Sequence, residues 1–435
     1  MTAQERADRR HVGQSGHDPG VDYRSPGQRD RDRILHSSAM RRLAGVTQVV
    51  GPSEGHGFHN RLTHSMKVAQ IARRLAERIS KGSTPEELAT HGGLDPDVVE
   101  AAALGHDLGH PPFGHVAEAV LDELLIRHGV LDGFEGNAQS FRIVTKLAIR
   151  SGWHPGLNLT RATLAASMKY PWRRTEANPK FAAYDSETRD YAFARAGLPA
   201  GVRTLEAEIM DWADDIAYSV HDLEDFYKAG LLPLHDLAQS KSIRDRYLGA
   251  TQERWLQVGL IATTDDFEPY AEAFHRVMDE FPPITEVFTG TTHQRAQLRT
   301  VTAFSVHLYS RSAQLSDTPE GPHLNIPAAI QAEVAMIKEL TWHYVIHQQG
   351  LATVQHGQKH IIRDLFEIYA AAIQRGELDI FPQRFQKSLL TESDPREHLR
   401  TAADAIASMT DQEASNTHGR LTGRRIGSVT DSIPH

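Results

Sequence analysis

Apolar residues recur at intervals of three and four along most of this chain, from about residue 29 to residue 412. The clearest example is RLTHSMKVAQIARRLAERI, where Val68, Ile71, Leu75 and Ile79 share one helix face. The same period runs through DPDVVEAAALGHDLGH, GHVAEAVLDELLIRHG and LEAEIMDWADDIAYSVHDLEDFYKAG. The alternation typical of strands is scarce, apart from a short stretch at 48–51. The pattern therefore predicts an all-α fold, a helical bundle with additional C-terminal helices.

Local composition divides the chain into four segments. Residues 1–28 are rich in Gly, Arg, Asp and Pro, which predicts a flexible N-terminal arm. Residues 29–235 carry most of the histidine and aspartate motifs and are expected to form the catalytic core. Residues 236–412 are expected to form a helical extension that completes the site and provides oligomer contacts. Residues 413–435 end without apolar periodicity, so we expect a loose tail there.

Composition narrows the class of protein. No run of about 18 apolar residues occurs and the N-terminus is polar, so neither a membrane span nor secretion is expected. The absence of cysteine excludes disulfides, thiolate metal ligands and cysteine nucleophiles, and it fits a cytoplasmic protein. A net charge of −9 argues against a protein that coats nucleic acid. The 25 histidines are the unusual feature, and their meaning depends on where they lie along the chain.

Two histidines lie on the inward faces of predicted helices. His64 shares the apolar face of the helix at 61–79, and His106 follows Val99 by seven residues on the next helix. A lone inward histidine is also typical of a hydrogen-bonded core residue. Asp107 comes directly after His106, however, and a buried aspartate is costly unless it is paired or bound to a cation.

A line of polar residues runs beside the apolar face of the helix predicted at 205–230. Asp214, Tyr218 and Asp222 are four residues apart, so they stack along one face at the edge of the core. A solvated acidic face is the alternative explanation. Two imidazoles and two carboxylates are thus available from three helices: His64, His106, Asp107 and Asp214. Such mixed donors suit an octahedral divalent ion such as Mn²⁺, Fe²⁺, Co²⁺ or Ni²⁺.

The stretch GHDLGHPPFGHVAE, residues 105–118, contains three further polar candidates. Its Pro-Pro pair stops one helix, and a new helix is expected from about Gly114. On that helix His115 and Glu118 are i and i+3, and a histidine beside a carboxylate is an acid–base unit. For His110, a contact at the C-terminal end of the first helix is the alternative to a functional role.

These motifs are similar to those of one enzyme family. The order H…HD…D, carried by RLTHS, GHDLGHPPFGH and WADDIAYSVHDLED, resembles the HD-domain metallophosphohydrolases. Within them it resembles the deoxynucleotide triphosphate triphosphohydrolases, or dGTPase family. RDRDRILHSSAMRRLAGVTQV, FEGNAQSFRIV and IASMTD extend the likeness over 29–412, more vaguely between about 230 and 390. The resemblance implies an HD-domain bundle and the same four metal ligands, with Mg²⁺ or Mn²⁺ as candidate ions. Asp214 is preferred to Asp215 because it heads the line with Tyr218 and Asp222.

The resemblance also implies roles for the other residues. Contacts to the phosphates are implied for three of them: Arg61, His110 and Tyr218. Asp222 would lie near the sugar 3′-hydroxyl, and His115 with Glu118 would be the catalytic pair. The implied reaction is attack of water on the α-phosphorus of a dNTP, dGTP being the expected substrate, to give deoxynucleoside and inorganic triphosphate. Whether His115 protonates the 5′-oxygen or helps to deprotonate water is left open by the sequence.

One departure and two alternatives accompany this interpretation. The chain reads FEGN where many relatives have FEHN, so Gly136 replaces a histidine, which could alter how the phosphates are held. The alternatives are another HD-type nucleotide phosphohydrolase, and a regulator that binds nucleotides or single-stranded DNA. The HDxxED and GYP signatures expected of two other HD classes are absent. The resemblance further implies a homo-oligomer, a tetramer or hexamer, with a dNTP effector in some relatives.

Overall fold

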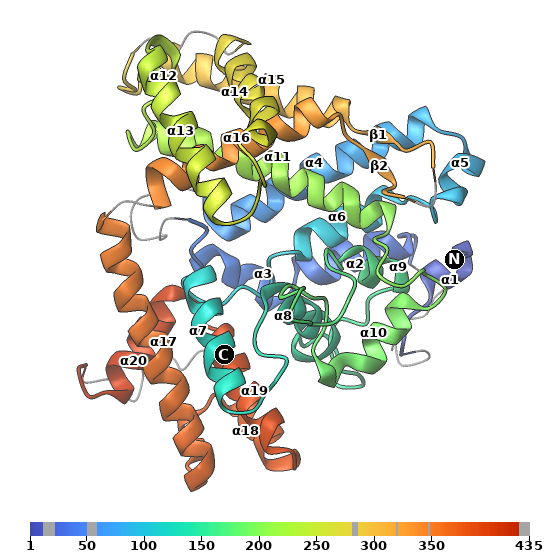
Figure 1. The fold of residues 1–435 in the computed structure, drawn as a ribbon. Coiled ribbons are helices and arrows are strands. Elements are labelled where there is room, and N and C mark those ends of the chain that lie inside the picture. Colours follow the sequence, from blue (N-terminus) through green and yellow to red (C-terminus); the bar gives the residue numbers. More distant parts are fainter. Residues whose placement is uncertain (12–21, 50–58, 281–285, 319–320, 347–348, 426–435) are drawn as a thin grey trace.

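The computed structural model describes residues 1–11, 22–49, 59–280, 286–318, 321–346 and 349–425. Helices dominate it, as Figure 1 shows, so the predicted all-α class is confirmed. Within the described ranges the only strands are β1 (Gln314–Leu315) and β2 (Leu324–Asn325), an antiparallel pair with Gln314 opposite Asn325. Of the expected strand at 48–51, residues 48 and 49 are not in a strand, and the other two lie outside the described residues.

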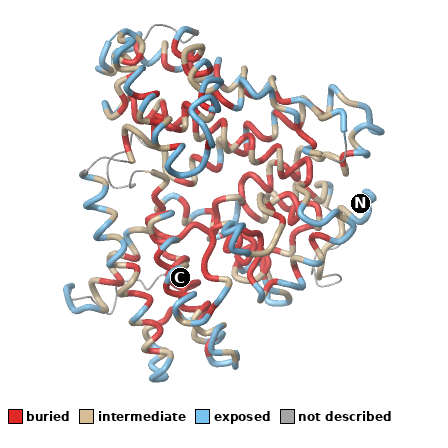
Figure 2. The backbone as a smooth tube through the Cα atoms, in the orientation of Figure 1, coloured by how far each residue is buried: buried red, intermediate tan, exposed pale blue. Residues whose placement is uncertain are grey.

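The centre of the molecule is a bundle of long helices. Its members are α2 (Pro26–Leu35), α4 (Arg61–Gly82), α6 (Pro96–Gly105) and α11 (Leu205–Lys228). Helix α4 packs on both α6 and α11, and the predicted apolar face from Val68 to Ile79 is buried against them. Figure 2 shows this buried layer running through the middle of the fold. The apolar period of the sequence predicts which face of α4 is buried, because residues three or four apart lie on the same side of a helix.

Helix α6 ends earlier than the sequence indicated. Asp95 caps its start, Pro96 occupies the first turn, and Gly105 is its last residue. His106 is the C-cap, and the chain then turns through hydrogen bonds from the Leu108 amide to Gly105 and from the His110 amide to Asp107. The expected continuation to about residue 110 is therefore wrong. The histidines and Asp107 lie on a tight turn and not on a helix face.

A second group of helices packs around its own core. Helices α7 (His115–Arg127), α17 (Gln349–Arg375), α19 (Pro395–Ala407) and α20 (Asp411–Leu421) enclose it, with η7 (Leu378–Ile380) and α18 (Gln383–Thr391) at its end. In Figure 1, α17 runs alongside α7, and these two helices are in contact. The C-terminal extension thus covers the helix that carries His115.

The remaining elements connect and cover these two groups. Those before α11 are α1 (Ala3–Ala7), α3 (Ser38–Arg42), η1 (Leu43–Gly45), α5 (Pro85–Thr90), α8 (Gly136–Arg142), η3 (Ile143–Leu147), α9 (Arg161–Ala166), η4 (Asp185–Glu187) and α10 (Thr188–Arg195). Those after it are α12 (Leu234–Gln239), α13 (Lys241–Gln257), η5 (Asp265–Phe267), α14 (Glu268–Glu280), α15 (Thr292–Ser312), α16 (Ala328–Thr341) and η6 (Trp342–Ile346). None of the helices in the described ranges combines the length and apolar character needed to cross a membrane.

The described parts of both chain ends are docked on the fold. Near the N-terminus, Arg9 lies 2.5 Å from Asp30, and Arg6 pairs with buried Glu206. These contacts and the start of α2 at residue 26 differ from the expected flexible arm at 1–28. At the other end, α20 continues to residue 421 with His418 2.8 Å from Asp364. The expected loose tail at 413–435 is therefore helical over its first part.

Candidate active site

A cavity of about 290 Å³ opens where α4, α7, α11 and the turn after α6 meet. Nine of the ten residues predicted for the site line it: Arg61, His64, His106, Asp107, His110, His115, Glu118, Asp214 and Tyr218. The tenth, Asp222, is buried one helical turn beyond Tyr218 and does not line the cavity. The fold thus brings together side chains from segments more than 150 residues apart.

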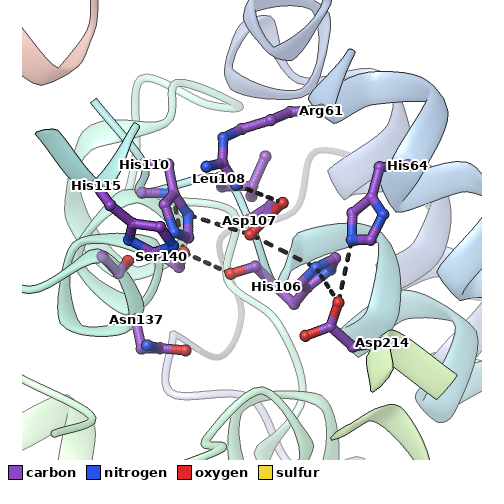
Figure 3. Close-up of polar contacts among 12 residues, drawn as sticks. Arg61, His64, His106, Asp107, Leu108, His110, His115, Asn137, Ser140 and Asp214 are labelled. Atoms are coloured by element: carbon purple, nitrogen blue, oxygen red, sulfur yellow. Dashed lines mark hydrogen bonds and ion pairs between the residues drawn. The ribbon is translucent and has the colours of Figure 1, made fainter. Parts of the chain in front are cut away.

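Two histidines and two aspartates lie together in the lining of this cavity (Figure 3). His64 Nε2 lies 3.0 Å from Asp214 Oδ1, and His106 Nε2 lies 3.6 Å from the same oxygen and 3.5 Å from Asp107 Oδ1. The two imidazole rings are 5.5 Å apart. Asp215, the alternative to Asp214, points elsewhere and pairs with Lys338 at 2.7 Å. Ligand atoms of His64, His106 and Asp107 all lie within 4.8 Å of one another, and Asp214 Oδ1 lies beside both histidine nitrogens.

The state of His106 tests whether these residues fit a metal ion. Its Nδ1 lies 2.7 Å from the Ala103 carbonyl oxygen, which can only accept, so Nδ1 carries the proton. Its Nε2 is buried and has no hydrogen-bond partner within the described structure. A metal-ligating histidine shows this arrangement, with one nitrogen held by a backbone carbonyl and the other presenting a lone pair. The residues therefore fit a divalent ion with nitrogen and oxygen ligands.

Lys169 is a functional candidate that the sequence pattern did not indicate. Its Nζ lies 2.5 Å from Asp211 and 3.2 Å from Asp214, inside the lining of the cavity. Burial alone would raise the pKa of Asp214, but Lys169, His106 and His64 together hold that pKa well below its usual value. Lys169 lies in the irregular chain after α9. Because it is outside a helix, the apolar period does not predict where its side chain points.

Arg61, for which a phosphate contact is predicted, lies in the cavity lining and contacts protein groups there. Its guanidinium donates to Asp107 Oδ2 at 2.8 Å and, through Nε, to the Thr47 carbonyl oxygen at 2.8 Å. Burial would raise the pKa of Asp107, but His106, Arg61 and His110 together lower it. Arg61 thus helps His106 and His110 to keep Asp107 ionised from within the cavity lining.

The turn between α6 and α7 holds a backbone conformation that few residues adopt. Phe113 has φ +65° and Gly114 has φ +60°, both in the left-handed region. The Phe113 amide donates to Asp411 Oδ1 at 2.8 Å, and this bond helps to hold the conformation. The turn ends at His115, which begins α7 as predicted.

His115 and Glu118 face each other as their spacing predicted. His115 Nδ1 lies 2.7 Å from Glu118 Oε2, while the other carboxylate oxygen accepts from the Gly136 amide at 2.7 Å. Burial would raise the pKa of Glu118, but the bond from His115 and the nearby His110 lower it to about 2. Glu118 is therefore a carboxylate at neutral pH, and His115, with 71% of its side chain exposed, is the more accessible partner.

His110 lies between the two groups, with Nδ1 3.1 Å from Asp107 Oδ1 and its ring 5.1 Å from that of His115. It therefore contacts side chains of the site, which the capping alternative did not require.

Glu135 is a second residue that the sequence pattern did not indicate. Burial and the charge of Glu118 raise its pKa to about 7, although the Ala138 amide and Asn137 bind its carboxylate.

Tyr218 and Asp222 continue the predicted line on α11. Tyr218 lines the cavity, and burial raises its pKa. Asp222 is 4% exposed, and its Oδ2 has no hydrogen-bond partner among the described residues. Burial, Asp225 and Asp214 raise the pKa of Asp222 well above its usual value. An unpartnered buried carboxyl oxygen is costly, so this atom needs a partner that the described residues do not supply.

Comparison with known proteins agrees with this geometry. The HD domain model matches residues 61–219, which carry the His64–Asp214 cluster, and a phosphohydrolase-associated domain model matches residues 324–420. Fold and site therefore define an HD-domain hydrolase in which His64, His106 and Asp107 could hold a divalent metal ion.

Several bacterial proteins are similar to this chain over nearly its whole length. A deoxyguanosinetriphosphate triphosphohydrolase-like protein of Streptomyces coelicolor is 37% identical over 418 residues, which cover 91% of this chain and 92% of the relative. Proteins of the same name from Corynebacterium glutamicum (strain ATCC 13032) and Bifidobacterium longum are 35% and 32% identical, over 90% and 93% of this chain and 90% and 84% of the relatives. The chain belongs to this deoxyguanosinetriphosphate triphosphohydrolase-like family.

Proposed function

We propose that this protein hydrolyses deoxynucleoside triphosphates, dGTP among them, to deoxynucleoside and inorganic triphosphate in a metal-dependent reaction. One observation carries the proposal. The His64–His106–Asp107–Asp214 cluster and the His115–Glu118 pair line the same cavity. Phosphate-ester hydrolysis needs both parts, one to offset phosphate charge and one to move a proton.

The cluster would hold a divalent ion, which supplies Lewis acidity, lowers the pKa of water and offsets phosphate charge. Around it the chain supplies cations of its own. Arg61, Lys169 and Lys180 all line the cavity. A triphosphate carries several negative charges, and cations fixed around it bind it and stabilise the charge that develops during hydrolysis.

His115 is the group proposed to exchange a proton with the substrate. Glu118 holds its Nδ1 at 2.7 Å and leaves Nε2 free. The carboxylate fixes the ring direction and stabilises its charged form. We assign His115 to protonation of the 5′-oxygen as the bond from the α-phosphorus to that oxygen breaks. A water molecule supplies the new oxygen on the triphosphate and releases one proton.

The sugar is proposed to lie towards Asp222. Its unpartnered Oδ2 would accept a hydrogen bond from the 3′-hydroxyl, and Tyr218, one turn earlier on α11, would pack between the sugar and the phosphates. A crowded sugar site of this kind would leave a 2′-hydroxyl without a partner. Ribonucleotides are therefore expected to be poor substrates.

Product analysis tests the proposal directly. The purified chain is incubated with each dNTP, alone and in mixtures, and with GTP, in the presence of Mg²⁺ or Mn²⁺, and products are resolved by ion-exchange chromatography. Equal amounts of deoxynucleoside and intact triphosphate are expected, and in ¹⁸O-labelled water the label should enter the triphosphate. Monophosphate with pyrophosphate, or orthophosphate, would refute the proposed reaction. Comparable turnover of GTP and dGTP would refute the sugar assignment alone.

A further inference from the structure

A second group of metal-ligating side chains lies beside the first. One ligand atom from each of His110, His115 and Glu118 can be chosen so that all three lie within 4.8 Å of one another. Figure 3 shows His110 and His115 together on one side of Asp107, with His64 and His106 on the other. The group thus shares the cavity with the metal cluster and shares none of its four ligands.

The donor set is that of a zinc site. Two imidazoles and one glutamate hold the ion in several zinc hydrolases, with a further position left open. His115 Nδ1 and Glu118 Oε2 are 2.7 Å apart and the rings of His110 and His115 are 5.1 Å apart. Ligand atoms around a tetrahedral ion at about 2.0–2.2 Å are separated by roughly 3.3 Å, so small rotations of exposed His115 would complete the site.

Gly136 keeps this group accessible. A Cβ atom there would lie 3.1 Å from Glu118 Oε1, 3.3 Å from His110 Cε1 and 3.4 Å from His110 Nε2. A side chain at this position would therefore crowd both Glu118 and His110. The Gly136 amide binds Glu118 Oε1, so the oxygen that would face an ion is Oε2, which His115 Nδ1 contacts at 2.7 Å.

We propose that His110, His115 and Glu118 form a second divalent-ion site, selective for Zn²⁺ over Mg²⁺, that fills after the His64–Asp214 cluster. Nitrogen ligands favour Zn²⁺, whereas Mg²⁺ prefers oxygen ligands. The His64–Asp214 cluster fills first because it offers two carboxylates, whereas the second site offers one. The consequence for catalysis rests on the proposed function: an ion on His115 and Glu118 removes the pair that moves the proton, so excess Zn²⁺ inhibits.

Counting bound ions tests the site without an activity assay. The metal-stripped full chain is titrated with Zn²⁺ in competition with a chromophoric chelator, for the wild type and for four variants. His115→Ala and Glu118→Gln should each lose one equivalent, or bind it at least tenfold more weakly. His64→Ala should lose a different equivalent. His36→Ala, an exposed histidine on the C-cap of α2, is the matched control and should bind as the wild type does.

The comparison between His115→Ala and His36→Ala is the decisive one. Other exposed histidines that bind zinc add the same number of ions to both variants, and His115 is exposed enough for its removal to leave the fold intact. Equal stoichiometry and affinity in these two variants would overturn the proposal. Loss of an equivalent in a protein that hydrolyses no dNTP would support the site and refute the proposed function. Loss of an equivalent without inhibition of dNTP hydrolysis by excess Zn²⁺ would overturn the inhibitory part.

Discussion

Replacement of Gly109 by alanine should damage both stability and activity, because Gly109 lies where two backbones meet. A Cβ at this position would lie 2.1 Å from the Gly136 carbonyl oxygen and 2.2 Å from the Ser140 amide nitrogen. Comfortable contacts between such atoms are about 3.5 Å, so the turn and α8 must separate by roughly 1 Å. The displaced turn carries Asp107 and His110, and the displaced helix begins at the residue that binds Glu118.

The expected cost follows from the contacts that are lost. Overpacking costs about 1–3 kcal/mol, and loss of the bond from the Gly109 amide to Ser140 Oγ, 2.8 Å long, costs about 1 kcal/mol. The free energy of unfolding should therefore fall by roughly 2–4 kcal/mol. A shift of about 1 Å in catalytic groups lowers turnover by roughly 100-fold. The loss of activity should exceed what the unfolded fraction explains.

Chemical denaturation and dNTP turnover of Gly109→Ala measure the two effects. The matched control is Gly105→Ala, four residues earlier, where the nearest atom to a new Cβ is Ile34 Cδ1 at 3.5 Å. This control should keep wild-type activity and gain up to about 1 kcal/mol, since alanine is favoured over glycine in a helix. If Gly109→Ala keeps the stability and the dNTP turnover of the wild type, as Gly105→Ala keeps its turnover, the inferred close approach of the turn to α8 is wrong.

Three further predictions concern single side chains. His115→Asn should lower kcat by about 100- to 10,000-fold with an unchanged thermal midpoint, whereas His36→Asn should retain full activity; equal turnover would exclude proton transfer by His115. Lys169→Met removes the ammonium group beside Asp211 and Asp214, which keep contacts with Arg203 and His64, so in EDTA the free energy of unfolding should fall by roughly 1–3 kcal/mol, and Mn²⁺ should restore more stability to this variant than to the wild type in thermal denaturation. Glu135 has a raised folded pKa of about 7, so its stabilising contribution is complete below about pH 4.5 and is lost as the pH rises through 7. Glu135→Gln should therefore gain thermal stability relative to the wild type at pH 8 but not at pH 4.5, and a pH-independent difference would contradict the shift.

The helices of the bundle could be predicted because their signal is local. A buried face repeats every three or four residues, so α4 and α11 were expected from their own sequences, and His64 and Asp214 could be placed on inward-facing positions. The same reasoning extended α6 too far. The apolar period stops at Leu104, and the turn after it is determined by hydrogen bonds to Gly105 and Asp107, which periodicity does not report.

Other parts of the site depend on contacts between distant segments. Lys169 reaches Asp214 across 45 residues, and Arg6 reaches Glu206 across 200. An isolated charged residue gives no indication of its partner, because every surface offers several carboxylates. For this reason the cation beside the metal cluster was missed and the N-terminal residues were expected to be flexible.

The C-terminal extension and the catalytic turn depend on each other. Asp411, the first residue of α20, accepts from the Phe113 amide at 2.8 Å and from the Thr47 amide at 3.1 Å, although 298 residues separate it from Phe113. Arg42 donates to the carbonyl oxygens of Leu108 and His110 in the turn, and also to that of Met409 just before α20. Without these bonds the buried backbone of the turn would lack partners, and the left-handed Phe113 would lose a bond that holds it. The turn between the predicted metal ligands and His115 therefore takes its shape from contacts with both early and late parts of the chain, and the second helical group supports the candidate active site.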